Sequence, residues 1–138
     1  MPDSNDLWPA NIADSHLITP VTILKEQAAL LGEKTRQLVK GEVVTQTTGS
    51  LLFHYFYIAA PTLNYRFELF NISHKVNFYP LVMRYANNTT SLASEDAFKE
   101  KLKEILTSQH TLNVVHSIIS AKTTWSASLP PSVSHAAS

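Results

Sequence analysis

The chain has no cysteine among its 138 residues. That absence excludes disulfide frameworks, thiolate metal sites and cysteine nucleophiles. It also fits a reducing compartment, so we expect a soluble protein of the cytoplasm. The first residues, Met1 to Asp6, are polar and acidic. A secretory signal needs a basic start followed by an apolar run, and we therefore expect none here.

Other signatures of defined function classes are missing as well. Only 3 glycines are present, and no glycine-rich phosphate-binding loop is among them. Basic and acidic side chains balance at 11 each, so the strong positive charge of many nucleic-acid-binding domains is absent. No apolar run approaches the roughly 20 residues that cross a bilayer. The sequence also lacks a Gly-x-Ser-x-Gly nucleophile motif, and we assign no catalytic residue.

The 6 histidines do not form a metal-binding pattern. No two of them lie four residues apart, and no acidic motif accompanies any pair. We therefore expect neither a metal site nor a cofactor. His54 alternates onto the side of a predicted strand that faces the core, where a hydrogen-bonded structural histidine is the simplest interpretation.

The length and composition fit one domain with two extensions. Residues 1–17 are polar with scattered apolar side chains, and we expect them to form an N-terminal arm. Residues 18–122 carry the periodic patterns of a single α+β domain. Residues 123–138 are rich in Ser, Ala and Pro, which predicts a disordered tail.

The first element of the predicted domain is a helix over about 20–39. Thr19 is a favourable N-cap and Pro20 suits the first helical position, where its missing N–H is not needed. Apolar residues then recur at helical spacing, and Gly41 is a plausible C-cap. A short β-branched strand over 42–47 follows.

The strongest pattern in the chain lies between Leu51 and Tyr85. Three strand-like runs, 51–58, 65–70 and 76–83, carry apolar residues on both of their faces. An antiparallel sheet with one solvated face would instead alternate apolar and polar residues. The predicted three-stranded meander therefore needs cover on both faces, from helices, from a second copy of the chain or from a ligand.

Two predicted hairpins give the meander its register. A loop over 61–64 pairs Ile58 with Phe67, and a two-residue turn at 73–74 pairs Leu69 with Phe78. Both registers place the same residues on the core face: Leu52, Phe56, Ile58, Tyr65, Phe67, Leu69, Phe78 and Val82. The opposite face then carries Phe53, Tyr55, Tyr57, Arg66, Glu68, Phe70, Tyr79, Leu81 and Met83. A one-residue slip would exchange the two sets.

Two helices are predicted after the sheet. A turn cluster at 87–90 precedes Ser94, a good N-cap followed by acids in the first turn, where the helix dipole favours them. A second short helix runs to about Lys122. The fold class that we expect is therefore α+β, with an N-terminal helix, a short strand, a three-stranded antiparallel meander and two C-terminal helices.

One cluster of polar groups on an apolar ground stands out as a candidate ligand site or interface. It consists of Tyr55, Tyr57, Arg66, Glu68, Phe70 and Tyr79. Polar groups that converge on an apolar wall are typical of a small-molecule pocket. The alternative is a cross-strand ion pair that sets the register or lies at a subunit interface, and it accounts for the same residues without a ligand or a reaction.

The leading functional hypothesis is an interaction or binding module, such as an accessory, immunity-like or regulatory protein, that forms a homodimer through the aromatic sheet face. Charged residues make up 16% of the chain, below the usual ~25%, which favours a surface hidden against a partner. The alternative is a small-ligand binder or enzyme in which Arg66 holds an anionic group and Glu68 exchanges a proton. A third hypothesis is single-stranded nucleic-acid binding, with bases stacked on the aromatic face.

Overall fold

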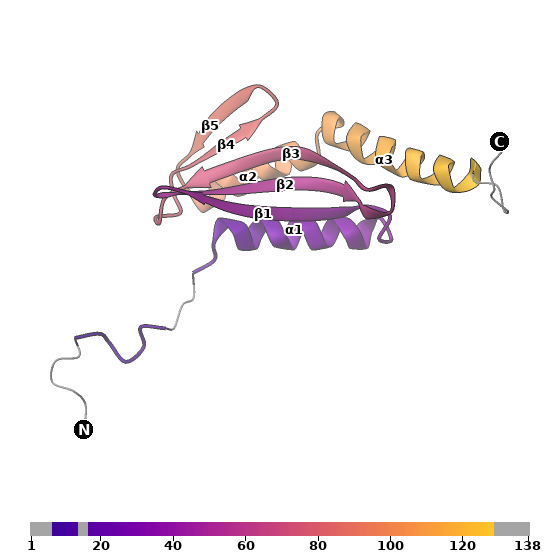
Figure 1. Cartoon of the computed structure of the whole chain (residues 1–138). Coiled ribbons are helices and arrows are strands. Elements are labelled where there is room, and N and C mark those ends of the chain that lie inside the picture. Colours follow the sequence, from indigo (N-terminus) through magenta and orange to yellow (C-terminus); the bar gives the residue numbers. More distant parts are fainter. Residues whose placement is uncertain (1–6, 14–16, 129–138) are drawn as a thin grey trace.

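The computed structural model describes residues 7–13 and 17–128. Its elements are α1 (Pro20–Lys34), β1 (Lys40–Thr48), β2 (Leu51–Ala60), the short 3-10 helix η1 (Pro61–Leu63), β3 (Tyr65–His74), β4 (Leu81–Tyr85), β5 (Asn88–Leu92), α2 (Glu95–Leu106) and α3 (Gln109–Ser128). The strands form one antiparallel sheet in the order β1-β2-β3-β4-β5 (Figure 1). The predicted α+β class is confirmed, although the sheet has five strands in place of a short strand and a three-stranded meander.

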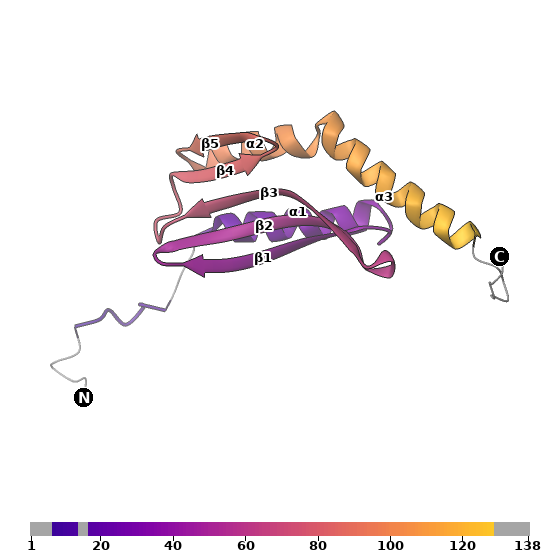
Figure 2. The same ribbon diagram turned by 45° about the horizontal axis from the view of Figure 1, so that its top comes forward.

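The helices pack on one face of the sheet, as the two ribbon views show together (Figures 1 and 2). One cluster of buried side chains joins them to the strands. Ile23 and Leu24 enter it from α1, Phe98 and Leu102 from α2, and Val115 from α3. The opposite face of the sheet has no helix over it in the described part of the chain. Of the three kinds of cover expected for that face, these residues therefore do not provide the helical one.

Helix α1 begins as predicted and ends earlier. The Thr19 hydroxyl accepts a hydrogen bond from the Thr22 N–H at 3.2 Å, and Pro20 is the first helical residue. The helix ends at Lys34 because the chain then turns through Arg36 and Gln37, which have positive φ angles of 55° and 66°. The predicted end near residue 39 is therefore wrong.

Gly41 is not the C-cap of α1 but a residue of β1, where it allows α1 to approach the sheet closely. A Cβ atom at this position would lie 2.5 Å from the Ala28 Cα and 2.6 Å from the Ala28 Cβ. Real side chains do not tolerate such distances, and the nearer of the two atoms is backbone. Glycine at residue 41 therefore sets the distance between α1 and β1.

The register of β2 and β3 matches the prediction near their connection and departs from it further along. Ile58 pairs with Phe67 as predicted. A β-bulge then places Phe56 opposite Phe70, so the predicted register, which would pair Phe56 with Leu69, is wrong beyond Tyr57. A bulge adds one residue to one strand, and as a result both Leu69 and Phe70 turn into the core.

The remaining strands differ more from the prediction. Residues 73–74 are not a turn, because β3 continues to His74, and the next strand starts only at Leu81. The predicted pair of Leu69 with Phe78 is therefore wrong, and Ile72 instead pairs with Met83. The predicted turn cluster at 87–90 lies mostly in β5, after a turn in which Ala86 has a φ of 55°.

Helix α2 begins where it was predicted, directly after Ser94. The Ser94 hydroxyl accepts a hydrogen bond from the Ala97 N–H at 3.1 Å and caps α2. Ser108 lies at the break between α2 and α3, and its hydroxyl donates a hydrogen bond to the Ile105 carbonyl at 2.7 Å. Helix α3 extends to Ser128, beyond the predicted end near Lys122 and into the segment predicted as a tail. Residues 129–138 lie outside the described residues.

We predict that Gly41→Ala destabilises the protein by about 1–3 kcal/mol, because the new methyl group overpacks the contact with Ala28. Urea unfolding followed by far-UV circular dichroism measures the change. Gly49→Asn is the matched control, since a side chain there meets open space and asparagine tolerates the positive φ of 60°. Equal midpoints for Gly41→Ala and the wild type would contradict the close-packing argument.

Candidate functional site

The face of the sheet that carries no described helix is rich in aromatic and charged side chains. Residues Phe53, Tyr55 and Tyr57 alternate outward along β2, and all three are half-buried. The neighbouring strands add Arg66, Glu68 and Arg84. We call these six residues, Phe53, Tyr55, Tyr57, Arg66, Glu68 and Arg84, the aromatic face.

Arg66 is held at one end of the aromatic face. Its guanidinium carbon lies 4.2 Å from the centroid of the Tyr57 ring, a cation–π geometry. Its Nη1 is 3.5 Å from the Glu42 Oε1, and both side chains are largely exposed. Exposed pairs of this kind contribute roughly 0–1 kcal/mol to stability, so the pair orders the surface more than it stabilises the fold.

A network of hydrogen bonds crosses the other end of the aromatic face. The Asn71 side-chain Nδ2 donates to Glu68 at 3.0 Å, and Arg84 donates to the Asn71 side-chain Oδ1 at 3.3 Å and to the Ser73 hydroxyl at 3.1 Å. The Arg84 guanidinium also lies 5.7 Å from the Phe53 ring centroid. These contacts hold the Arg84 guanidinium near the Phe53 ring and link it through Asn71 to Glu68.

The structure brings together four of the six predicted site residues, Tyr55, Tyr57, Arg66 and Glu68. The other two are elsewhere. Phe70 is in the core and stacks on Phe56 with 5.1 Å between ring centroids, because the bulge turned it inward. Tyr79 lies in the connection before β4, with its ring 6.5 Å from that of Phe98 on α2. Leu81 and Met83, also expected on this face, are buried in the core.

Tyr79 has an unusual environment for a phenol. Within the described residues its hydroxyl is buried and has no hydrogen-bond partner. Burial raises the pKa of Tyr79, and the charge of Glu95 raises it further. A buried hydroxyl without a partner costs free energy relative to its solvated state in the unfolded chain.

We predict that Tyr79→Phe leaves the protein as stable as the wild type or more so, because only the unpaired hydroxyl is removed. Tyr85→Phe is the matched control, since the Tyr85 hydroxyl lies 3.2 Å from the Ser108 hydroxyl and that hydrogen bond would be lost. The control should be less stable by about 1 kcal/mol in urea unfolding. A larger loss in Tyr79→Phe than in the control would indicate a partner for the phenol.

The inner face of the sheet contains a buried pair of histidines, His54 and His74, whose Nε2 atoms are 3.0 Å apart. His74 Nδ1 is 2.6 Å from the Lys75 carbonyl oxygen, which can only accept, so this nitrogen carries a proton. For the neutral pair, His74 Nε2 then accepts from His54 Nε2. His54 Nδ1 in turn accepts from the Thr45 hydroxyl at 2.8 Å. The predicted hydrogen-bonded core position of His54 is confirmed.

This arrangement opposes protonation of His54. Its pKa is lowered to about 4, first by burial and then by the charges of His74 and of Lys25 on α1. The pair is a satisfied element of the core. A metal centre has no support here, since the described residues contain no group of three or more histidine, cysteine, aspartate or glutamate side chains placed to hold an ion.

We predict that the free energy of unfolding falls as the pH drops from 6.5 to about 4. In that interval unfolded His54 binds a proton and folded His54 does not, so the loss is about 3 kcal/mol at ~1.4 kcal/mol per pKa unit. Above pH 6.5 both states are neutral, and below about 4 both are charged, so this group then adds no slope. Urea unfolding at a series of pH values measures the change.

His54→Gln should flatten this pH dependence, whereas His116→Gln, a change at an exposed histidine, should keep it. The same slope in His54→Gln and in the wild type would assign the pH dependence to other groups.

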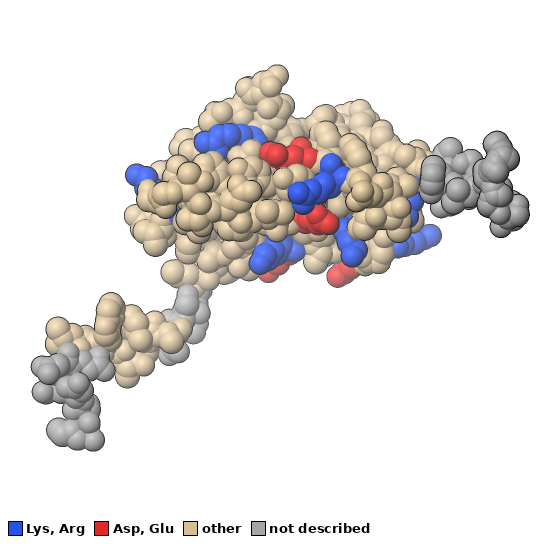
Figure 3. Space-filling model, in the orientation of Figure 1, with Lys and Arg blue, Asp and Glu red and all other residues tan. Residues whose placement is uncertain are grey.

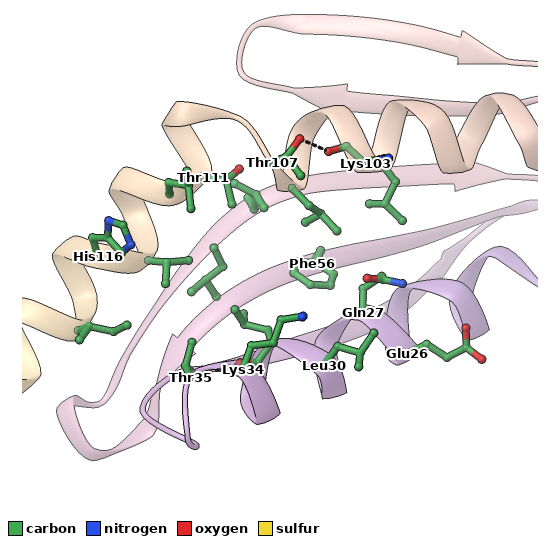
Figure 4. Close-up of a pocket in the computed structure, with 18 of the residues that line it drawn as sticks. Glu26, Gln27, Leu30, Lys34, Thr35, Phe56, Lys103, Thr107, Thr111 and His116 are labelled. Carbon is green, nitrogen blue, oxygen red and sulfur yellow. Dashed lines mark hydrogen bonds between the residues drawn. The ribbon is translucent and has the colours of Figure 1, made fainter.

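A second candidate site is a groove on the helical side of the sheet, between α1 on one wall and α2 with α3 on the other (Figure 4). Its volume is about 980 Å³. Phe56, Ile58 and Leu69 from the strands form the floor. The walls add further leucines, of which Leu30 on α1 and Leu112 on α3 are about 40% exposed. Sequence reasoning did not find this site.

The rim of the groove is basic. Lys34 and Arg36 line it at the end of α1, and Lys99 and Lys103 line it from α2, against a single acid, Glu26. Lys99 pairs with Glu95 at 2.9 Å. The chain as a whole has no such bias, with 11 basic and 11 acidic side chains, and on the face seen in Figure 3 the two kinds are interspersed.

The basic rim has little signal in the sequence, because lysines on amphipathic helices normally face water. Leu30 and Leu112 are about 40% exposed, and this exposure becomes visible only once the helices are placed on the sheet.

The comparisons with known proteins add no assignment. No protein-family model, curated protein or solved structure matches the chain. Among the described residues no helix has the length and apolar content needed to cross a membrane.

Proposed function

We propose that the protein is a binding module without catalytic activity, of an accessory, immunity-like or regulatory kind, and that it forms a homodimer across the aromatic face. The observation that carries the proposal is the location of the half-buried aromatic residues Phe53, Tyr55 and Tyr57, on the side of the sheet with no described helix. Tyrosine, phenylalanine and arginine are enriched at protein interfaces. The lack of cysteine fits a cytoplasmic protein, and that location is part of the same proposal.

The charges on the aromatic face favour a second copy of the chain as the partner. Acids and bases lie side by side on this face, with Glu42 on β1, both Arg66 and Glu68 on β3, and Arg84 on β4. A two-fold axis through such a face can bring acids of one copy against bases of the other. The balanced net charge of the chain also leaves little repulsion between copies.

The other functional hypotheses receive less support from the same residues. Arg66 already contacts Tyr57 and Glu42, so a small anionic ligand would have to displace them. Acids among the aromatic rings also repel the phosphates of a single-stranded nucleic acid. Neither the small-ligand nor the nucleic-acid hypothesis explains why no described helix covers this face of the sheet.

We expect light scattering to give a mass of twice the 15.4 kDa of one chain at two protein concentrations. Tyr57→Ala or Glu68→Ala should shift the protein toward the monomer, because each removes a side chain that belongs to the aromatic face. Val76→Ala removes an exposed apolar side chain outside the face and should leave the mass unchanged.

Circular dichroism checks that each variant is folded. A monomeric wild type at both concentrations, or an unchanged dimer in both variants, would overturn the proposed dimer.

A further inference from the structure

The groove on the helical side of the sheet has the features of a helix-binding site. Between Ile23 and Lys34 its α1 wall extends about 17 Å at ~1.5 Å per residue, which matches about three turns of a bound helix. The floor is apolar, and the exposed Leu30 and Leu112 project from facing walls. At residue 122 the Lys122 ammonium donates to the Leu38 carbonyl at 3.1 Å and ties α3 to the segment after α1.

Charge at the rim narrows the choice of ligand. Lys34, which points into the opening in Figure 4, and Arg36 belong to the wall at the end of α1, and Lys103 belongs to the opposite wall on α2. Within the described residues none of these three side chains makes an ion pair. Unneutralised cations therefore flank the apolar floor on both sides.

We propose that the groove binds an acidic amphipathic helix of a partner protein. The apolar stripe of such a helix would contact Leu30, Leu106 and Leu112, above the buried floor, and its acidic side chains would face Lys34, Arg36 and Lys103. Helices recognised in grooves place apolar residues at positions i, i+3 or i+4 and i+7, and this spacing fits a floor about three turns long. The groove and the aromatic face lie on opposite sides of the sheet, so this interaction is independent of the proposed dimer.

A long-chain carboxylate is the main competing ligand, because it also combines an apolar body with negative charge. Its single anionic group would use one cation or one cluster of cations. The rim instead distributes cations over both walls and over separate helices, which suits a ligand with charges along both of its sides. The distribution of charge thus favours the helix.

The test uses a designed peptide of leucine and glutamate, with leucine at i, i+3, i+4 and i+7, labelled with a fluorophore for anisotropy measurements. We expect saturable binding that weakens as salt screens the charges. A peptide with lysine in place of glutamate, and a scrambled peptide without the apolar stripe, should bind at least about tenfold more weakly, a difference of ~1.4 kcal/mol.

The double variant Lys34→Glu with Lys103→Glu should lose at least about tenfold in affinity for the acidic peptide and gain affinity for the lysine peptide. The variant Lys40→Glu with Lys75→Glu changes the net charge equally at exposed positions outside the groove and should bind as the wild type does. Leu30→Gln reports on the apolar wall and should weaken the acidic peptide without affecting the mass of the assembly.

Several outcomes would overturn the proposal. They are a lack of saturable binding of the acidic peptide, equal binding of the acidic, basic and scrambled peptides, and binding of hexadecanoate but not of the acidic peptide. Loss of the dimer in Tyr57→Ala with unchanged peptide binding would leave the groove proposal intact, so the two proposals fail separately.

Discussion

The Phe56 and Phe70 rings stack on the inner face of the sheet at the β-bulge between β2 and β3. Because the bulge adds one residue to β3, both Leu69 and Phe70 turn toward the helices. The helices α1, α2 and α3 then have an apolar surface on one side of the sheet on which to pack. Both candidate surfaces depend on this arrangement, since it leaves the aromatic face without a helix and makes Phe56 and Leu69 the floor of the groove.

The way the helices pack explains why a groove remains on the covered side. Helix α1 lies close to β1 because Gly41 has no side chain to hold it away. Helices α2 and α3 cover the sheet from the β5 side and from β2, with the break at Ser108 between them. Strand residues form the floor of the groove between the two walls, and they are apolar. The charged side chains of the groove come from α1, from the segment after it and from α2.

The two buried histidines are arranged for stability more than for chemistry. His54 and His74 form a chain of hydrogen bonds from Thr45 to the Lys75 carbonyl, and in the neutral pair each of these ring nitrogens has a partner. A pair that excludes charge in this way is unsuited to frequent proton transfer near neutral pH, because the pKa of His54 is lowered to about 4.

The sequence by itself determined the α+β class, the start of α1 at Thr19 and Pro20, the cap of α2 at Ser94, and the outward positions of Tyr55, Tyr57, Arg66 and Glu68. These follow from local chemistry and from strand alternation, which need no knowledge of distant residues. Only the tertiary structure decided the positions of Phe70 and Tyr79, because a bulge and the end of a strand depend on how neighbouring strands pair. It alone also brought the cations of α1 and α2 to one groove, since residues so distant in sequence meet only when the helices pack on the sheet.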